Sequence, residues 1–194
     1  WHGSMKNYIN SKLKIFKNQD QSCYAIICID DSHTRKVASN FRKKFKSKLL
    51  CISTENPNKA DIYLESNNKA IRIINFISNE NIIIPYDHIK FTKAKHNFCN
   101  LLCAYTASFL LKQKKEKFIE SVKFLGNLEH RIEFIGNLKE VNFFNDSKST
   151  NVNSAKTAIN SFSNIFWILG GRQKKGGLKG IENNLDNVVQ AYSF

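Results

Sequence analysis

A short polar stretch combines several side chains that suit the binding of an anionic ligand. Residues 145–151 read Asn-Asp-Ser-Lys-Ser-Thr-Asn, so a carboxylate, an ammonium group and three hydroxyls lie within seven positions. An apolar alternation over 139–144 predicts a strand before the stretch, and helical spacing over 152–162 predicts a helix after it. Ligands of open α/β sheets bind at such loops, where the free amides of a helix N-terminus favour anions and phosphates.

The same loop also suits a purely structural role. Asn151 or Ser149 would act as the N-cap of the following helix, and Asp146 would hold the bend. The residue types alone leave both interpretations open.

Two further segments carry ligand-binding side chains. Paired glycines, Gly170 and Gly171, end a predicted strand and precede several cations, which suits a close approach of the backbone to an anion or simply a flexible loop. Asn97 and Asn100 are three residues apart, so they share one face near the start of the predicted helix 93–112. Capping and packing explain such a pair equally well.

Composition places limits on the class of protein. The 194 residues suffice for one ordinary domain or two small ones, and 42% hydrophobic content is compatible with a packed core. The formal net charge is +14, which fits nucleic acid, an anionic membrane surface or polyanionic small ligands, although the lysines are scattered. The most basic segment, residues 34–48, is the best candidate for nucleic-acid binding, but it lacks interleaved aromatic residues suited to base stacking.

The cysteines and the termini bear on the cellular context. The five cysteines form no Cys-x-x-Cys pair and indicate reduced, buried thiols of a cytoplasmic protein; they are Cys23, Cys28, Cys51, Cys99 and Cys103. No signal peptide and no apolar run of membrane-spanning length occur, so no membrane association is expected. The chain begins with Trp1 rather than Met, and we expect both of its ends to be cut.

The hydrophobic pattern predicts an α/β protein. Helices are predicted over residues 4–18, 34–45, 93–112, 116–124, 152–162 and 181–189, and strands over 22–29, 48–53, 61–65, 70–77, 81–86, 131–135, 141–144 and 165–169. The short strands between 61 and 86 predict a meander or hairpins, and a further hairpin is expected around Gly136-Asn137. A change in composition after residues 125–127 indicates a hinge, with domains over 1–126 and 127–194.

Taken together, these motifs resemble the Mur ligase family. The resemblance is carried by His130-Arg131, by residues 145–151 and by Leu169-Gly170-Gly171 with Lys174. Upstream, Lys-His-Asn-Phe-Cys-Asn at 95–100 resembles the family's His-Asn-x-x-Asn helix start. Most members carry Asp-Tyr-Ala-His or Asp-Gly-Ala-His where this chain has Asp-Ser-Lys-Ser, which resembles the members that add D-glutamate. The resemblance covers nearly the whole chain but is weak between residues 50 and 90.

The resemblance implies a fold and an activity. The expected fold is α/β: the latter part of a central ATP-binding domain, residues 1–126, followed by the start of a Rossmann-like, amino-acid-binding C-terminal domain, residues 127–194. The expected activity is an ATP- and Mg²⁺-dependent ligation of D-glutamate to UDP-N-acetylmuramoyl-L-alanine through an acyl phosphate, in peptidoglycan precursor synthesis for cell shape and division. The full-length protein is expected to be a cytoplasmic monomer that does not bind nucleic acid.

The resemblance also assigns roles at the ATP and metal sites. Asn97 and Asn100 would lie at the ATP site, with Asn100 near the adenine. Arg131 would contact phosphate oxygens, and Asp146 would accept hydrogen bonds from the ribose hydroxyls. Lys12 matches the lysine that the family carbamylates, which would make it a catalytic group and a Mg²⁺ ligand.

The remaining roles concern the amino-acid substrate. Lys148, Thr150 and Lys174 would hold the carboxylates of D-glutamate, and Lys148 would also serve catalysis. His130 would be a supporting neighbour. Two oriented lysines around a dicarboxylate would favour glutamate over neutral amino acids.

The chain also departs from the family pattern. It contains no G-x-x-G-K-[ST] phosphate-binding loop, and the Asp-His-x-Asp metal motif would end just before Trp1, so His2 does not stand for its histidine. The resemblance also leads us to expect that the nucleotide-sugar-binding N-terminal domain and the end of the C-terminal domain lie outside these 194 residues. We therefore expect the 194 residues alone not to catalyse ligation. A nucleic-acid-binding protein and a decayed, inactive relative remain as alternatives.

Overall fold

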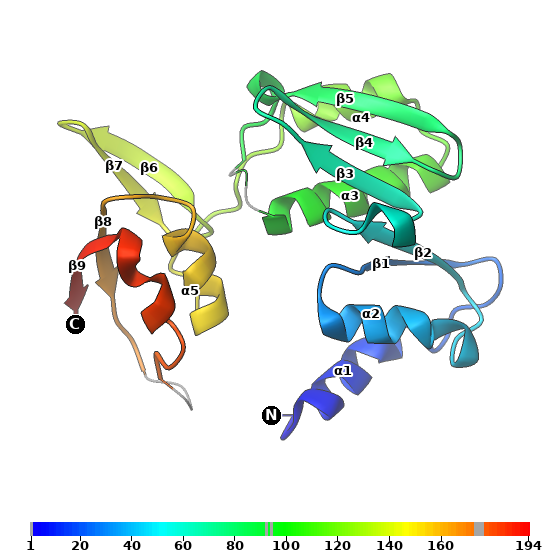
Figure 1. Ribbon diagram of the computed structural model, residues 1–194, viewed down its shortest axis with the longest axis horizontal. Coiled ribbons are helices and arrows are strands. Elements are labelled where there is room, and N and C mark those ends of the chain that lie inside the picture. The colour runs from blue at the N-terminus through cyan, green and yellow to red at the C-terminus, as the bar shows by residue number, and fades with distance from the viewer. Residues whose placement is uncertain (1, 92, 94, 173–176) are drawn as a thin grey trace. The chain divides into compact units, whose positions relative to one another are not determined.

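The structure is a computed structural model that describes residues 2–91, 93, 95–172 and 177–194. The described residues divide into two compact units, one within residues 1–89 and 95–125 and the other within 90–94 and 126–194. Figure 1 labels the helices and strands of each unit.

The first unit is built around a five-stranded sheet with the order β1-β2-β3-β4-β5. Its strands are β1 (Tyr24–Cys28), β2 (Lys48–Ser53), β3 (Ile62–Ser66), β4 (Ala70–Asn75) and β5 (Glu80–Pro85). The first three strands are parallel, and β3, β4 and β5 continue as an antiparallel meander. The meander predicted between residues 61 and 86 is therefore confirmed.

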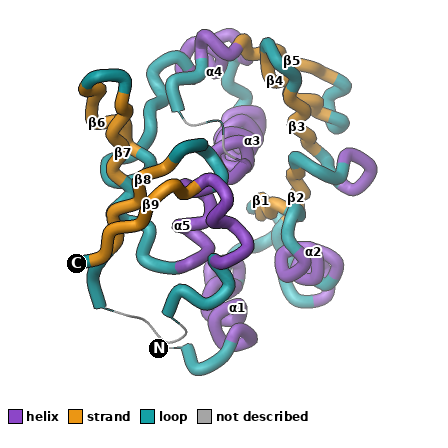
Figure 2. The backbone as a smooth tube through the Cα atoms, turned by 60° about the vertical axis from the view of Figure 1, so that its left-hand side comes forward, coloured by secondary structure: helices purple, strands orange, loops and turns teal. Residues whose placement is uncertain are grey.

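The helices α2 (Ser32–Ser39) and α3 (Lys95–Leu110) pack on this sheet. The unit also contains α1 (Met5–Leu13), which has no buried residue, and α4 (Lys115–Val122), which contacts α3, with short 3₁₀ segments at Lys14–Phe16, Phe41–Lys43, Pro57–Lys59 and Tyr86–His88. Ala25 and Ile27 of β1 and Ile29 just after it are buried on the side of α2, while Cys28, which alternates with them, meets α3. Because successive side chains of a strand point to opposite faces, α2 and α3 lie on opposite faces of this part of the sheet (Figure 2).

The basic helix predicted over 34–45 is shorter than expected and begins earlier. Asp31 is its N-cap, and the Asp31 carboxylate accepts hydrogen bonds from the backbone N–H groups of His33 (2.7 Å) and Thr34 (3.0 Å). The helix ends at Ser39 because Asn40 leaves the helical conformation and its side chain donates to the Lys36 carbonyl (3.0 Å). The chain then turns inward and buries Phe41 completely.

The second unit consists of two small sheets and one helix. Its strands are β6 (Glu133–Leu138), β7 (Val141–Asn145), β8 (Ile165–Leu169) and β9 (Val188–Ser193), and its helix is α5 (Val152–Ile159). The pair β6–β7 is antiparallel and the pair β8–β9 is parallel. The predicted helix 181–189 is wrong in type: Glu182–Asn187 is a 3₁₀ segment, after which β9 begins. This segment contains three asparagines and one aspartate, which are weak helix formers.

The β6–β7 hairpin is confirmed, but its turn is not where the glycine predicts. The turn residues are Lys139 (φ 48°) and Glu140 (φ 67°), between the paired residues Leu138 and Val141. Gly136 instead lies at an irregularity of the β6 register. Cross-strand packing explains this register, because Phe134 pairs with Phe144 across the hairpin with their ring centroids 5.5 Å apart.

We expect a Lys139→Asn, Glu140→Gly double variant to stabilise the second unit by about 1 kcal/mol. Two-residue hairpin turns with positive φ at both positions strongly prefer Asn-Gly, whereas other side chains are strained there. Urea unfolding followed by the fluorescence of Trp167 in β8, in a Trp1→Phe background, measures the effect. A loss of stability in the double variant would contradict the assigned turn.

Among the described residues, no helix is both long enough and apolar enough to span a membrane.

Candidate functional site

The loop 145–151 lies between β7 and α5, as the sequence predicts. Asn151 is the N-cap of α5 and accepts a hydrogen bond from the Ser154 backbone N–H (2.9 Å). Asp146 holds the bend, because its carboxylate accepts from the Ser149 hydroxyl and its carbonyl accepts from the Ser149 N–H (2.8 Å). The structural role of the loop is thereby confirmed, with Asn151 rather than Ser149 as the cap.

Hydrogen bonds join this loop to the segment around residues 130–132. The Asp146 carboxylate accepts from the Ile132 N–H (3.0 Å), and the Lys148 N–H donates to the His130 carbonyl (3.1 Å). The Asn145 side-chain amide lies 2.7 Å from His130 Nδ1. Two of the predicted motifs, separated by about fifteen positions in the sequence, therefore meet in one place.

The backbone at this junction is strained. Ile132 is buried and adopts a φ of +48°, a left-handed conformation that is costly for a β-branched side chain. Two hydrogen bonds hold it there, because the Asn127 amide donates to the Ile132 carbonyl (2.7 Å) and Asp146 accepts from the Ile132 N–H. Backbone strain that neighbouring groups hold in place is common at ligand-binding sites.

Two cationic side chains at this junction are available to a ligand. Arg131 and Lys148 are exposed, and neither side chain makes a hydrogen bond or an ion pair within the part of the chain that the structure describes. Thr150 is exposed beside them on the loop. Lys174, which the sequence assigns to the same substrate, lies outside the described residues.

The remaining predicted residues lie in the first unit. Asn97 is half-buried and Asn100 is exposed, and both lie in the first two turns of α3. Lys12 lies in the last turn of α1, where its ammonium group is exposed and sits 5.6 Å from the centroid of the Tyr8 ring. The predicted site residues therefore fall into two groups, one in each unit.

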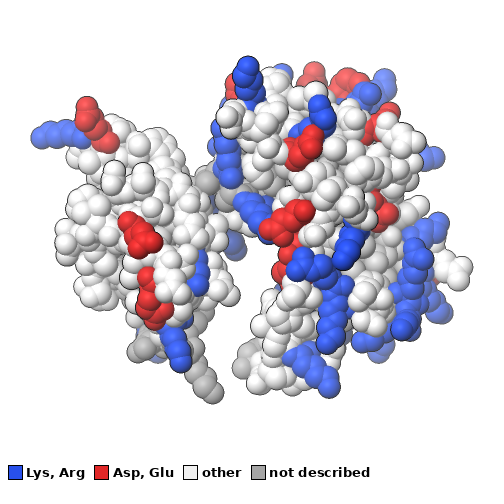
Figure 3. Space-filling model, viewed as in Figure 1, with Lys and Arg blue, Asp and Glu red and all other residues white. Residues whose placement is uncertain are grey.

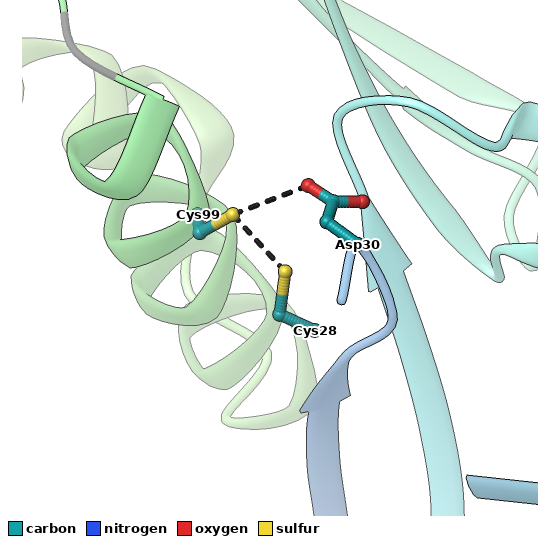
Figure 4. A group of neighbouring side chains, drawn as sticks. All are labelled: Cys28, Asp30 and Cys99. Carbon is teal, nitrogen blue, oxygen red and sulfur yellow. Dashed lines mark hydrogen bonds between the residues drawn. The ribbon is translucent and has the colours of Figure 1, made fainter. Parts of the chain in front are cut away.

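A third group of side chains was not identified from the sequence (Figure 4). Cys28, Asp30 and Cys99 offer two sulfur atoms and one carboxylate oxygen that all lie within 4.8 Å of one another. The two sulfur atoms are 3.0 Å apart, and Cys99 Sγ lies 3.4 Å from Asp30 Oδ2. We call this group the thiol–carboxylate cluster.

Parallel strands position the carboxylate of this cluster. Asp30 directly follows β1, and Ser53 and Thr54 lie where the neighbouring parallel strand β2 ends. The Asp30 carboxylate accepts hydrogen bonds from the Ser53 hydroxyl, the Thr54 N–H (3.1 Å) and the Thr54 hydroxyl (2.6 Å). Polar residues that follow two neighbouring parallel strands are a sequence signal for such a group, because the ends of these strands meet at one sheet edge.

Local interactions set the acidities of the cluster. The hydrogen bond between the two thiols lowers the pKa of Cys28, and the same interaction together with burial raises the pKa of Cys99. Burial alone would raise the pKa of Asp30, but the hydrogen bonds from Ser53 and Thr54 outweigh burial and hold this pKa below its usual value. All five cysteines of the chain are free and half-buried, rather than fully buried as predicted.

The chain belongs to the Mur ligase family, because residues 1–108, more than half of its length, match the Mur ligase middle domain. It is similar to proteins named UDP-N-acetylmuramoylalanine–D-glutamate ligase. The relative from Rickettsia bellii is 32% identical over 200 residues, covering 100% of this chain and 42% of the relative. The relative from Natranaerobius thermophilus is 31% identical, covering 90% of this chain and 36% of the relative.

Solved Mur ligases share the fold. MurF ligase from Thermotoga maritima, determined in complex with ADP, superposes with a TM-score of 0.73 at 13% identity, covering 100% of this chain and 45% of that one. A UDP-N-acetylmuramoyl-L-alanyl-D-glutamate–2,6-diaminopimelate ligase superposes with a TM-score of 0.62 at 17% identity, covering 100% and 40%. The predicted α/β Mur ligase fold is confirmed. The chain spans about two fifths of the length of the relatives from Rickettsia.

Proposed function

We propose that this chain is part of an ATP-dependent ligase that joins D-glutamate to UDP-N-acetylmuramoyl-L-alanine in peptidoglycan precursor synthesis. The observation that carries the proposal is the junction between the loop 145–151 and the segment 130–132, which presents Arg131, Lys148 and Thr150 together. The names of the relatives support the same substrates. Because the substrates are nucleotides and a free amino acid, the proposal includes a cytoplasmic reaction. It also includes a full-length protein that is monomeric.

The proposal divides the chain into two functional parts. Residues 1–126 form the latter part of the central ATP-binding domain, and residues 127–194 form the first part of the amino-acid-binding C-terminal domain. The division of the structure into two compact units supports this assignment.

On the nucleotide side, four residues take part: Asn97, Asn100, Arg131 and Asp146. The Asp146 carboxylate suits its assigned role, because each of its oxygens accepts one hydrogen bond from the chain and retains a further lone pair for a ribose hydroxyl. Arg131 supplies an exposed, permanently charged group for phosphate oxygens. The ADP bound to MurF from Thermotoga maritima supports nucleotide binding by this fold.

On the amino-acid side, Lys148, Thr150 and Lys174 hold the carboxylates of D-glutamate, and His130 supports them. The contact of His130 with Asn145, at 2.7 Å, keeps its ring against the loop. An exposed ammonium group competes with water for a carboxylate only where the site orients it. The hydrogen bond from the Lys148 N–H to the His130 carbonyl fixes the backbone from which this side chain projects.

The reaction requires neutralisation of charge. Phosphorylation of the substrate carboxylate to an acyl phosphate brings two anions together, and the amine of D-glutamate then displaces phosphate. Lys148 and Arg131 provide positive charge for these anions, and Mg²⁺ would provide more when bound.

Lys12 enters the proposal through carbamylation. Its ammonium group, which lies over the Tyr8 ring, cannot bind Mg²⁺, whereas a carbamate offers oxygen ligands. We expect Lys12→Ala to lose ligation in the full-length protein and to regain part of it when formate or acetate is added. Full activity of the variant without added acid would exclude this role, and Lys6→Ala on the same helix is the control.

The decisive experiment measures ADP release by the full-length protein containing this chain, with UDP-N-acetylmuramoyl-L-alanine and Mg²⁺, with and without D-glutamate. Strict dependence on D-glutamate is expected. If the protein is folded and has an intact phosphate-binding loop but does not release ADP, it is a decayed, inactive relative of the ligases.

A nucleic-acid-binding function is the weaker alternative. Basic side chains are numerous on the first unit in the view of Figure 3, but acidic groups lie among them. The match to the Mur ligase middle domain over residues 1–108 favours a ligase instead of a nucleic-acid-binding protein. Binding to DNA that weakens steeply with salt would be its signature.

A further inference from the structure

We propose that the thiol–carboxylate cluster is a binding site for one thiophilic divalent metal ion, of which Zn²⁺ is the representative. Cys28, Asp30 and Cys99 are its ligands. Its ligands differ from the residues assigned above to ATP, Mg²⁺ and D-glutamate, although Cys99 lies between Asn97 and Asn100 on α3. The proposal does not depend on the proposed ligase function.

The three ligand atoms lie within 4.8 Å of one another, which is close enough for them to bind one ion at a face of a tetrahedral site. In a tetrahedral Zn²⁺ site with Zn–S bonds near 2.3 Å, two sulfur atoms are about 3.8 Å apart, and a sulfur and an oxygen are slightly closer. The cluster has a sulfur–sulfur distance of 3.0 Å and a Cys99 sulfur–oxygen distance of 3.4 Å. A shift of the sulfur atoms by less than about 1 Å would therefore admit the ion. The fourth position would be open to water or another ligand.

The ligand types select the metal. Two thiolates and one carboxylate suit Zn²⁺ and similar ions and do not suit Mg²⁺, which prefers an all-oxygen shell. Binding replaces the proton of each thiol, so it releases up to two protons. With Asp30, two thiolates carry three negative charges, of which the ion neutralises two. The ammonium group of Lys95, one turn before Cys99 on α3, lies near the cluster, where it is ion-paired with Glu55.

The carboxylate ligand is already oriented by the chain. Thr54 donates to Asp30 through both its backbone N–H and its hydroxyl, and the Ser53 hydroxyl also donates to Asp30. The Arg35 guanidinium bonds the carbonyls of Ile29 (3.1 Å) and Asp30 (2.9 Å), which fixes the backbone from which this carboxylate projects. Such outer partners are a regular feature of protein metal sites.

The three ligands come from two elements that are distant in sequence. Cys28 and Asp30 lie at the end of β1, whereas Cys99 lies on α3, 71 positions beyond Cys28 (Figure 4). An ion bound by all three would cross-link this edge of the sheet to the helix that covers it. Since the unfolded chain does not preassemble these ligands, binding should raise the thermal stability of the first unit.

The test is a titration of the reduced, metal-free chain with Co²⁺ alone, followed by competition with Zn²⁺. We expect one equivalent of Co²⁺ to give a thiolate-to-metal charge-transfer band, which Zn²⁺ then removes. Cys28→Ser and Cys99→Ser should each lose most of the band. Thr54→Val, which removes only an orienting hydroxyl, should weaken Co²⁺ binding by about 10- to 100-fold. Cys23→Ser, whose thiol lies outside the cluster, is the matched control and should bind as the wild type does.

A second measurement needs no variant. Addition of Zn²⁺ to the unbuffered wild-type chain should release up to two protons for each bound ion. It should also raise the melting temperature of the chain. Absence of the charge-transfer band in the reduced wild type would overturn the proposal, as would its persistence in Cys28→Ser.

Discussion

Lys148→Ala, introduced into the full-length protein, should raise the D-glutamate concentration needed for half-maximal ligation by about 10- to 100-fold. The estimate corresponds to the loss of one hydrogen bond between a cation and a carboxylate. The Lys148 side chain is exposed and makes no hydrogen bond or ion pair among the described residues, so its removal should leave the fold intact. The apparent affinity for ATP should change little, and steady-state ADP release at varied concentrations of both substrates measures the two effects separately.

The matched control for this variant is Lys139→Ala. It removes the same charge from the exposed β6–β7 turn of the same unit. If both variants shifted D-glutamate use equally, the effect would come from the overall charge of the protein. If neither variant changed D-glutamate use, Lys148 would not be a substrate-binding residue.

Local signals in the sequence predict most of the elements. The strands 48–53 and 165–169 have the bounds of β2 and β8, because each is a compact apolar run between polar residues. Asn151, one of the two predicted caps, is the N-cap of α5, since an asparagine directly before a helical pattern satisfies free backbone N–H groups. Here the local preferences of the chain and its packing agree.

Sequence reasoning fails where packing overrides a local preference. Gly136-Asn137 has the composition of a turn, yet the register that pairs Phe134 with Phe144 places the turn at Lys139 and Glu140. The aromatic contacts continue beyond the hairpin, since the ring centroids of Phe144 and Phe162 are only 4.3 Å apart. The contacts between these aromatic rings outweigh the cost of two side chains with positive φ.

The thiol–carboxylate cluster could not be recognised from spacing. Cys28 and Cys99 are 71 positions apart, and neither belongs to a Cys-x-x-Cys pair. The cluster arises because the parallel pairing of β1 with β2 fixes one sheet edge, and because α3 packs on the face to which Cys28 points. Only the tertiary structure brings these groups together.

Asp146→Ala should have two large effects, one on stability and one on catalysis. It should destabilise the second unit by about 1–3 kcal/mol, because the N–H of the buried Ile132 would lose its acceptor and the Ser149 hydroxyl would lose its own. In the full-length protein it should also raise the apparent Michaelis constant for ATP by at least about tenfold, if the carboxylate binds the ribose hydroxyls. Urea unfolding of the chain and steady-state ADP release measure the two effects.

Asp146→Asn separates these two effects. Its side-chain carbonyl can still accept from the Ile132 N–H, and its amide can donate to the Ser149 oxygen in place of the present bond, so stability should be nearly retained. The negative charge is lost, however, and a neutral acceptor binds hydroxyl groups more weakly than a carboxylate does. A stable Asp146→Asn protein with impaired ATP use would support the ribose contact. A stable variant with unchanged ATP use would leave Asp146 as the residue that holds the strained junction and nothing more.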